Sequence, residues 1–118
     1  MKQEDNLILI PKIENYIEYV LKMLVKLPRT EKFNIGSEYK NSIYTLLKSA
    51  IYIYKIGNKL YYCNIMDAEL IMQRIYVRIM FNNHWIDEKK YKVCMEHIHE
   101  IGKLVGGLIK YYAKNNQK

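Results

Sequence analysis

Near the C-terminus, apolar residues repeat in alternating steps of four and three, and this repeat strongly constrains the fold. The residues on this seam are Cys94, Ile98, Ile101, Val105, Leu108 and Tyr112. Such steps place side chains on one face of an α-helix, as along the seams where helices pack on one another. The segment is therefore predicted to be a helix that buries one face against other helices.

The same segment contains three of the five glycines, Gly102, Gly106 and Gly107. A glycine inside a helix is destabilising by about 0.5–1 kcal/mol relative to alanine, so three of them cost about 2–3 kcal/mol. Because the seam runs through the glycines without a break, fraying is the weaker explanation. We expect another helix to pack closely on the bare glycine surface, either inside the subunit or from a neighbouring subunit.

Three further amphipathic segments precede this helix and predict one all-α domain over residues 1–118. The four helices are expected at about residues 11–27, 35–56, 67–82 and 87–113. No segment shows the alternation that is typical of a half-buried strand. Short connections between consecutive helices favour an up-down-up-down four-helix bundle.

Local signals mark the predicted helix ends. Pro11 is expected to begin the first helix and Pro28 to stop it. Asp67 and Asp87 are expected to cap the third and fourth helices. Residues 60–65 are either a connector or a continuation of the preceding helix. Gly57 can supply a positive backbone angle between the second and third helices.

The third predicted helix has apolar residues on two faces. The face expected to point inward carries Ala68, Ile71, Met72, Ile75 and Ile79. The far face carries Leu70, Val77 and Phe81. A helix that is apolar on two faces is either central in its bundle or packs on another protomer, and the small size of the domain favours the second. The candidate residues for oligomer or helix packing are therefore Leu70, Val77, Phe81, Gly102, Gly106 and Gly107.

The chain has a net charge of +7, which is spread over both halves of the sequence. A basic surface of this kind indicates a polyanionic partner, with nucleic acid first. The candidate contacts are Lys48, Lys55, Arg74, Arg78, Lys103 and Lys110.

Other interpretations of these basic residues stay open. Lys48 and Lys55 alternate with Tyr44 and Tyr52. This pattern suits phosphate contacts with bases stacked on the rings, but it also suits a solvated face or a subunit contact. The two arginines could instead form ion pairs at an interface.

The sequence lacks a recognisable catalytic or metal-binding constellation. His97 and His99 are two residues apart and point in different directions on a helix. Glu96 and His99 make a single Glu-x-x-His pair, whereas a di-iron bundle needs two. Cys63 and Cys94 have no metal-site spacing and are expected to be buried, neutral thiols. We expect no catalytic activity, no cofactor and no metal.

The apolar runs are too short to cross a membrane, because a spanning helix needs about 18 or more consecutive apolar residues. The N-terminal residues include acids and lack the apolar core of a signal peptide. A cytoplasmic protein without a membrane segment is expected.

Two segments of the chain carry distinctive motifs. Residues 27–36, Leu-Pro-Arg-Thr-Glu-Lys-Phe-Asn-Ile-Gly, contain a proline, four residues, an aromatic, one residue, an aliphatic and a glycine. Residues 100–110 are Glu-Ile-Gly-Lys-Leu-Val-Gly-Gly-Leu-Ile-Lys. The first segment resembles the pattern after the first helix, and the second resembles the fourth-helix signature, of the four-helix accessory proteins of diversity-generating retroelements, the accessory variability determinant (Avd-like) family. That signature usually has tryptophan where this chain has Leu108. The resemblance covers roughly residues 10–112.

The resemblance implies a homopentameric barrel with a basic surface that binds RNA or DNA and a partner reverse transcriptase. In such a system the accessory protein supports mutagenic copying of a template RNA into cDNA and is not itself a polymerase. Two alternatives remain. One is a four-helix oligomerisation module with a protein-only partner. The other is a four-helix protein of the type encoded by 23S ribosomal RNA intervening sequences, although residues 48–54 lack the proline usual in that type.

Overall fold

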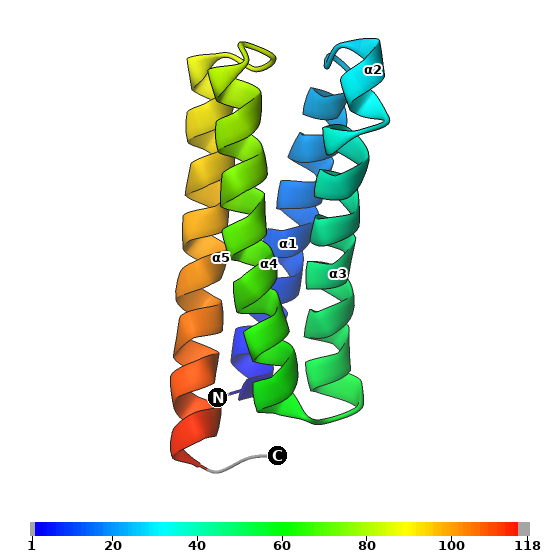
Figure 1. The fold of residues 1–118 in the computed structure, drawn as a ribbon. Coiled ribbons are helices and arrows are strands. Elements are labelled where there is room, and N and C mark those ends of the chain that lie inside the picture. The colour runs from blue at the N-terminus through cyan, green and yellow to red at the C-terminus, as the bar shows by residue number, and fades with distance from the viewer. Residues whose placement is uncertain (1, 116–118) are drawn as a thin grey trace.

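Four long α-helices form an antiparallel bundle in the computed structural model, which describes residues 2–115 (Figure 1). The elements are α1 (Lys2–Leu24), α2 (Arg29–Lys32), α3 (Ile35–Lys55), α4 (Lys59–Asn82) and α5 (Glu88–Lys114). The long helices run alternately up and down, and the one-turn helix α2 lies in the connection between α1 and α3. The predicted all-α, up-down-up-down four-helix bundle is confirmed.

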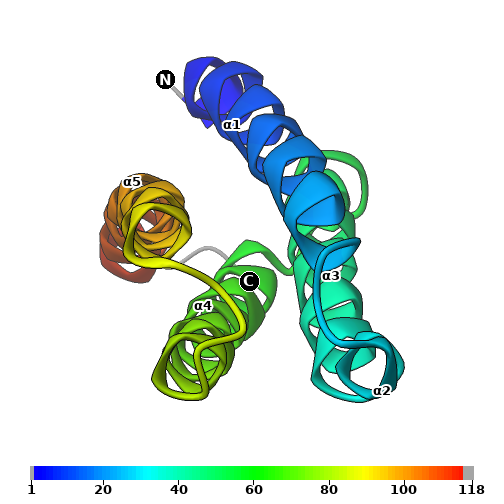
Figure 2. The ribbon, with the colours of Figure 1, turned by 90° about the horizontal axis from the view of Figure 1, so that it is seen from above.

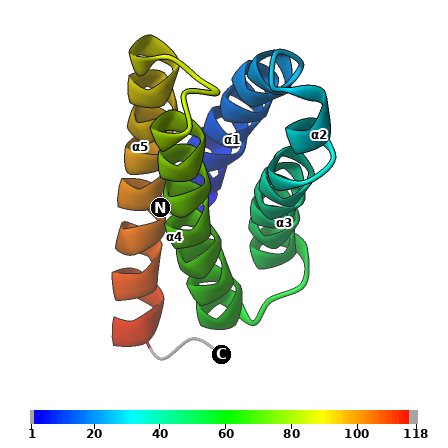
Figure 3. The same cartoon turned by 45° about the horizontal axis from the view of Figure 1, so that its top comes forward.

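The long helices surround the core in the order α1, α3, α4, α5, and α5 closes the ring against α1 (Figure 2). As a result α3 lies diagonally opposite α5. The α2 turn and the α4–α5 loop lie at the same end of the bundle (Figure 3). Outward side chains of α3 and α5 therefore reach opposite sides of the molecule.

The seam of α5 is buried as predicted. Each of its six residues is at most 1% exposed: Cys94, Ile98, Ile101, Val105, Leu108 and Tyr112. The Asp87 cap is also confirmed, because its Oδ1 accepts the backbone N–H of Lys90 at 2.8 Å. This hydrogen bond is the main cause that lowers the pKa of the Asp87 carboxyl. Both features were predictable because the seam pattern and the cap each involve residues within a few turns of one another.

The first helix differs from the prediction at both ends. Pro11 lies inside α1 instead of beginning it. Leu9 and Ile13 on either side are fully buried, so the apolar contacts outweigh the backbone hydrogen bond that an internal proline removes. The helix also ends at Leu24, before Pro28, which instead precedes α2.

The third predicted helix begins eight residues early, at Lys59, so residues 60–65 belong to α4. Asp67 is inside this helix and does not cap it. The helix starts directly after a tight turn in which Gly57 has φ 112° and Asn58 has φ 50°. The positive angle expected at Gly57 is confirmed. With both angles positive, the chain can reverse within two residues, which leaves no room for a longer connector.

The two apolar faces of α4 are exchanged relative to the prediction. Leu70 and Val77 are at most 1% exposed and face the core, whereas Ile71 is 51% and Ile79 40% exposed. The buried face of α4 consists of Cys63, Met66, Leu70, Gln73, Val77 and Met80. Two of these residues lie before the predicted start of the helix, and a third is polar. The predicted apolar pattern of this helix therefore lacked three residues of the core face, which is why that face was assigned to the outside.

Polar groups inside the bundle are paired with each other. The hydroxyls of Tyr16 and Tyr39 lie 2.9 Å apart between α1 and α3. Between α3 and α4, Gln73 Nε2 donates to Ser42 Oγ at 2.9 Å, and Ser42 donates to Glu69 Oε1 at 2.6 Å. These bonds satisfy most of the buried polar atoms that would otherwise destabilise the core.

Both cysteines are buried, free thiols. Burial raises the pKa of Cys63 to about 12 and that of Cys94 to about 11. Since the thiolate is the reactive form, both groups are neutral and inert near pH 7 in the folded chain. The expectation of buried, neutral thiols is confirmed.

Candidate functional site

The six predicted basic residues lie on two separate sides of the bundle. Lys103 and Lys110 are exposed on the outer face of α5, opposite its buried seam. Lys48 and Lys55 are exposed on α3, which is diagonal to α5. The structure therefore does not bring these four lysines together.

The arginines of α4 extend the basic side of α5. A Cβ atom built on Gly102 would lie 3.5 Å from Arg74 Nη2, so the Arg74 guanidinium reaches across to α5. Arg78 follows one turn later on α4 and is exposed. We call Arg74, Arg78, Lys103 and Lys110 the α4–α5 basic face. None of the four takes part in an ion pair with a carboxylate among the residues whose side chains are described.

The tyrosines beside Lys48 and Lys55 are not all free to stack on a ligand. The Tyr52 ring already contacts the Tyr62 ring, with centroids 5.2 Å apart. Tyr44 is 38% exposed. The α3 face therefore offers fewer open aromatic rings than the sequence suggested.

The glycines of α5 do not share one environment. A Cβ atom built on Gly102 would be in ordinary contact with the side chains of Arg74 and Leu70 of α4. A Cβ atom at Gly106 or Gly107 would meet nothing within 4 Å. Close packing of these two glycines inside the subunit was predicted as one alternative, and it is wrong. Only a contact from outside the subunit could still use their bare surface.

An apolar stripe runs along the outward side of α4. Its exposed members are Ile71 at 51%, Met72 at 39% and Ile79 at 40%, and we call these residues with Ala68 and Ile75 the α4 outer stripe. The stripe lies beside Arg74, which contacts the Gly102 position of α5. Phe81, a predicted packing residue, is half-buried and stacks on Tyr91 of α5 with centroids 4.5 Å apart.

His97 lies between α5 and α1 rather than in a metal site. Its ring stacks on Tyr16 at a centroid distance of 5.4 Å and lies 5.9 Å from the Tyr19 ring. Burial lowers the pKa of His97. Among the residues whose side chains the structure describes, 8–115, no three histidine, cysteine or acidic side chains come together as metal ligands would.

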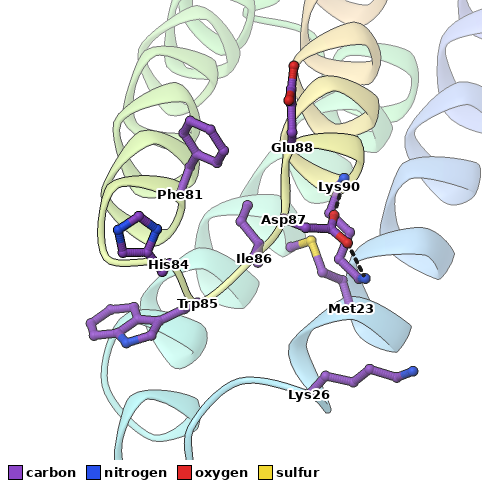
Figure 4. A pocket seen from close by; sticks show the side chains of 9 residues that line it. All are labelled: Met23, Lys26, Phe81, His84, Trp85, Ile86, Asp87, Glu88 and Lys90. Atoms are coloured by element: carbon purple, nitrogen blue, oxygen red, sulfur yellow. Dashed lines mark hydrogen bonds and ion pairs between the residues drawn. The ribbon is translucent and has the colours of Figure 1, made fainter.

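An open cavity lies at the end of the bundle that carries the α4–α5 loop (Figure 4). Its volume is about 480 Å³. Trp85 and His84 stand on one side of it, Lys26 and Lys90 on the other, and Met23 lies between α1 and the loop. The sequence did not predict this cavity. A lone tryptophan in a polar loop was the only signal, and nothing in the sequence placed the end of α1 beside it.

In the part of the chain that the structure describes, no helix is long and apolar enough to cross a membrane.

The comparisons with known proteins agree with the bundle architecture. A solved structure of a protein of unknown function from the S23 ribosomal protein family of Bacteroides thetaiotaomicron superposes with a TM-score of 0.80. The superposition covers 90% of this chain and 98% of that one at 14% sequence identity, which establishes the shared fold alone. No curated protein matches the chain. A family described as bAvd-like matches residues 7–112, nearly the whole sequence. The chain therefore belongs to the bAvd-like family, as its resemblance to the Avd-like accessory proteins predicted.

Proposed function

We propose that this chain is a non-enzymatic accessory protein of a diversity-generating retroelement. In this role it binds nucleic acid and a reverse transcriptase and supports mutagenic cDNA synthesis from a template RNA. The match to the bAvd-like family over residues 7–112 carries the proposal. The net charge of +7 and the α4–α5 basic face, of which Arg78, Lys103 and Lys110 are exposed, supply the electrostatic attraction that such a role requires.

The proposed nucleic-acid contacts are mainly contacts to phosphate. Lysine and arginine side chains on a convex helical surface attract the backbone regardless of sequence. Lys103 and Lys110 are the best placed, because both point outward from α5. Arg74 and Arg78 continue the same positive surface onto α4.

The double variant Lys103→Glu/Lys110→Glu is expected to weaken RNA and DNA binding. The plot of log affinity against log salt concentration should also become less steep by about two, because each lysine that neutralises a phosphate contributes about one to the slope. Fluorescence anisotropy of a labelled oligonucleotide over a salt series measures both quantities. The oligomer size should not change.

The matched control is Lys48→Glu/Lys55→Glu, which alters the same charge on the opposite side of the bundle. If the α3 variant loses binding and the α5 variant does not, the assignment to the α4–α5 basic face is wrong. A wild-type protein that binds no nucleic acid at low salt would instead favour the second candidate, a protein-only oligomerisation module. The exposed α4 outer stripe is the observation that favours this second candidate.

In the proposed function this chain acts as a homo-oligomer, a pentamer as the resemblance to the Avd-like family implies. The α4 outer stripe is an apolar surface that a single protomer leaves in water, which is typical of a surface covered by a partner. Gly106 adds a bare backbone surface on the same side of α5 as Gly102, where another helix can approach closely.

The variant Gly106→Leu is expected to reduce the oligomer size while the helix content stays unchanged, because the Cβ atom of the new side chain has no neighbour within 4 Å inside the subunit. Light scattering and circular dichroism measure the two properties. Glu96→Leu adds the same side chain at an exposed position of α5 away from α4 and should leave the oligomer intact. If Gly106→Leu has the normal oligomer size, the glycine surface takes no part in assembly.

A further inference from the structure

Two cavities at one end of the bundle adjoin each other and share part of their lining. The larger, of about 480 Å³, lies under the α4–α5 loop. The smaller, of about 190 Å³, lies on the adjoining surface of α1. They share Met23, Lys26 and Lys90. We call this combined feature the end groove; Trp85 marks its loop end, and Tyr19 and Lys22 its α1 end.

We propose that the end groove binds an unpaired segment of a single-stranded nucleic acid. Bases stack on Trp85 and Tyr19, and the lysines between these rings hold the phosphates. The proposal rests on the nucleic-acid binding proposed above, but it assigns the base contacts to a different place from the α4–α5 basic face. Aromatic rings combined with a positive groove are the usual means of binding single strands without sequence preference.

The structure holds both aromatic rings in place. The Trp85 backbone N–H donates to the Met80 carbonyl at 2.9 Å, which fixes the loop against the end of α4. Trp85 is only partly buried, so part of its indole remains accessible. Tyr19 is also partly exposed, and its ring is braced by His97 at 5.9 Å. Rings held in this way lose little conformational entropy when a base stacks on them.

The lysines of the end groove are available to a polyanion. Lys22 in the last turn of α1 and Lys26, two residues beyond the end of that helix, are both exposed. Neither forms an ion pair with a carboxylate among the side chains described. Lys90 is the third cation and makes a long, 3.5 Å ion pair with Asp87.

Two acidic residues also line the larger cavity, and both already have partners. Asp87 Oδ1 accepts the Lys90 backbone N–H as the cap of α5. Glu88 Oε2 lies 3.0 Å from Lys92 Nζ. These partners partly compensate the negative charges of the two acids. Lys22 and Lys26 therefore make the end groove positively charged.

A single strand fits this groove better than a duplex does. In a duplex both faces of each base are covered by its neighbours in the stack, so no base is free for an aromatic side chain. A flexible strand can turn one or two bases into the groove while its phosphates follow the lysines. Stacking on Trp85 therefore makes the site selective for unpaired bases.

Trp85 is the only tryptophan in the chain, so its fluorescence reports directly on the groove. Titration with a short oligodeoxythymidine at low salt is expected to quench this emission. An abasic deoxyribose-phosphate oligomer of the same length should bind through its phosphates without the same quenching. A duplex of equal length should likewise give little quenching. Anisotropy of an end-labelled oligonucleotide measures total binding in parallel.

Trp85→Ala is expected to weaken oligodeoxythymidine binding by about 5- to 150-fold, the usual effect of losing one base–aromatic stack. Lys26→Glu should weaken it as well and abolish the quenching at the original concentration. Tyr54→Ala, which removes a 51% exposed ring from α3, is the matched control and should bind normally. Lys26 is exposed, so its variant tests the groove even if Trp85→Ala is poorly folded.

The outcomes separate the two proposals. If the labelled oligonucleotide binds but the Trp85 emission does not change, and both groove variants bind normally, the end groove is not the site and the proposed function stands. If the wild-type protein shows no binding by anisotropy, nucleic-acid binding fails as a whole, and the end groove fails with it.

Discussion

Leu70→Ala is expected to lower the free energy of unfolding by about 2–5 kcal/mol, whereas Ile71→Ala, one residue further, should change it by no more than about 0.5 kcal/mol in the isolated subunit. Leu70 is 1% exposed and packs in the core, so its truncation removes apolar contacts and leaves a cavity. Ile71 is 51% exposed and loses few contacts inside the subunit. Urea unfolding followed by circular dichroism measures both values.

The comparison is made at two protein concentrations. Association stabilises the folded state by mass action, so an interface residue has an effect that grows with concentration. We expect Ile71→Ala to show such a dependence and to reduce the oligomer size, because Ile71 belongs to the α4 outer stripe. A larger loss for Ile71→Ala than for Leu70→Ala at the lower concentration would mean that the orientation of α4 is wrong.

Tyr39→Phe is expected to lower the free energy of unfolding by about 1–3 kcal/mol, because it leaves a buried hydroxyl without its partner. The Tyr16 and Tyr39 hydroxyls lie 2.9 Å apart, and both residues are fully buried. The double variant Tyr16→Phe/Tyr39→Phe should lose less than the sum of the two single variants, since no orphaned hydroxyl remains. If the loss in the double variant equals the sum of the two single losses, the two hydroxyls do not interact.

The same pair makes stability depend on alkaline pH. Burial raises the pKa of both Tyr16 and Tyr39 well above the ordinary value. The unfolded chain therefore loses these protons at lower pH than the folded chain does. The stabilisation is complete below about pH 10, the ordinary tyrosine pKa, and is lost as the pH rises above it. The double phenylalanine variant should show a weaker decline between neutral and alkaline pH.

Much of the fold follows from short-range patterns. The seam from Cys94 to Tyr112 identifies α5 and its buried face, because side chains three and four residues apart share a helix face. Asp87 marks the start of α5 for an equally local reason, the hydrogen bond to Lys90. Gly57 marks the turn before α4 because it can adopt a positive φ. Each of these local signals can be recognised without knowledge of a distant part of the chain.

The start of α4 and its core face were not predictable in this way. Both sides of α4 are apolar, so periodicity alone leaves two solutions. The choice depends on groups in other helices: Ser42 of α3 accepts a hydrogen bond from Gln73, and the Gly102 surface of α5 lies against Leu70. The polar Gln73 also interrupts the apolar pattern of the core face, so periodicity does not identify this face as buried.

The candidate sites show the same division. The sequence identified Lys103 and Lys110 as outward basic residues, because both fall opposite a clear seam. It could not show that Lys48 and Lys55 lie on the other side of the bundle, since that depends on the order of helices around the core. It also gave no reason to join Trp85 with Lys22 and Lys26, which are about sixty residues apart along the chain and adjoin one groove.

By itself, the sequence determined the helical class, the seam of α5, the cap at Asp87 and the basic character of the chain. These properties come from composition and from interactions within a few turns of helix. Only the tertiary structure decided which face of α4 is buried, whether Gly106 touches another helix, and which lysines share a surface. Those outcomes depend on packing between helices that are distant in the sequence, where several arrangements satisfy the same local pattern and only side-chain complementarity selects one.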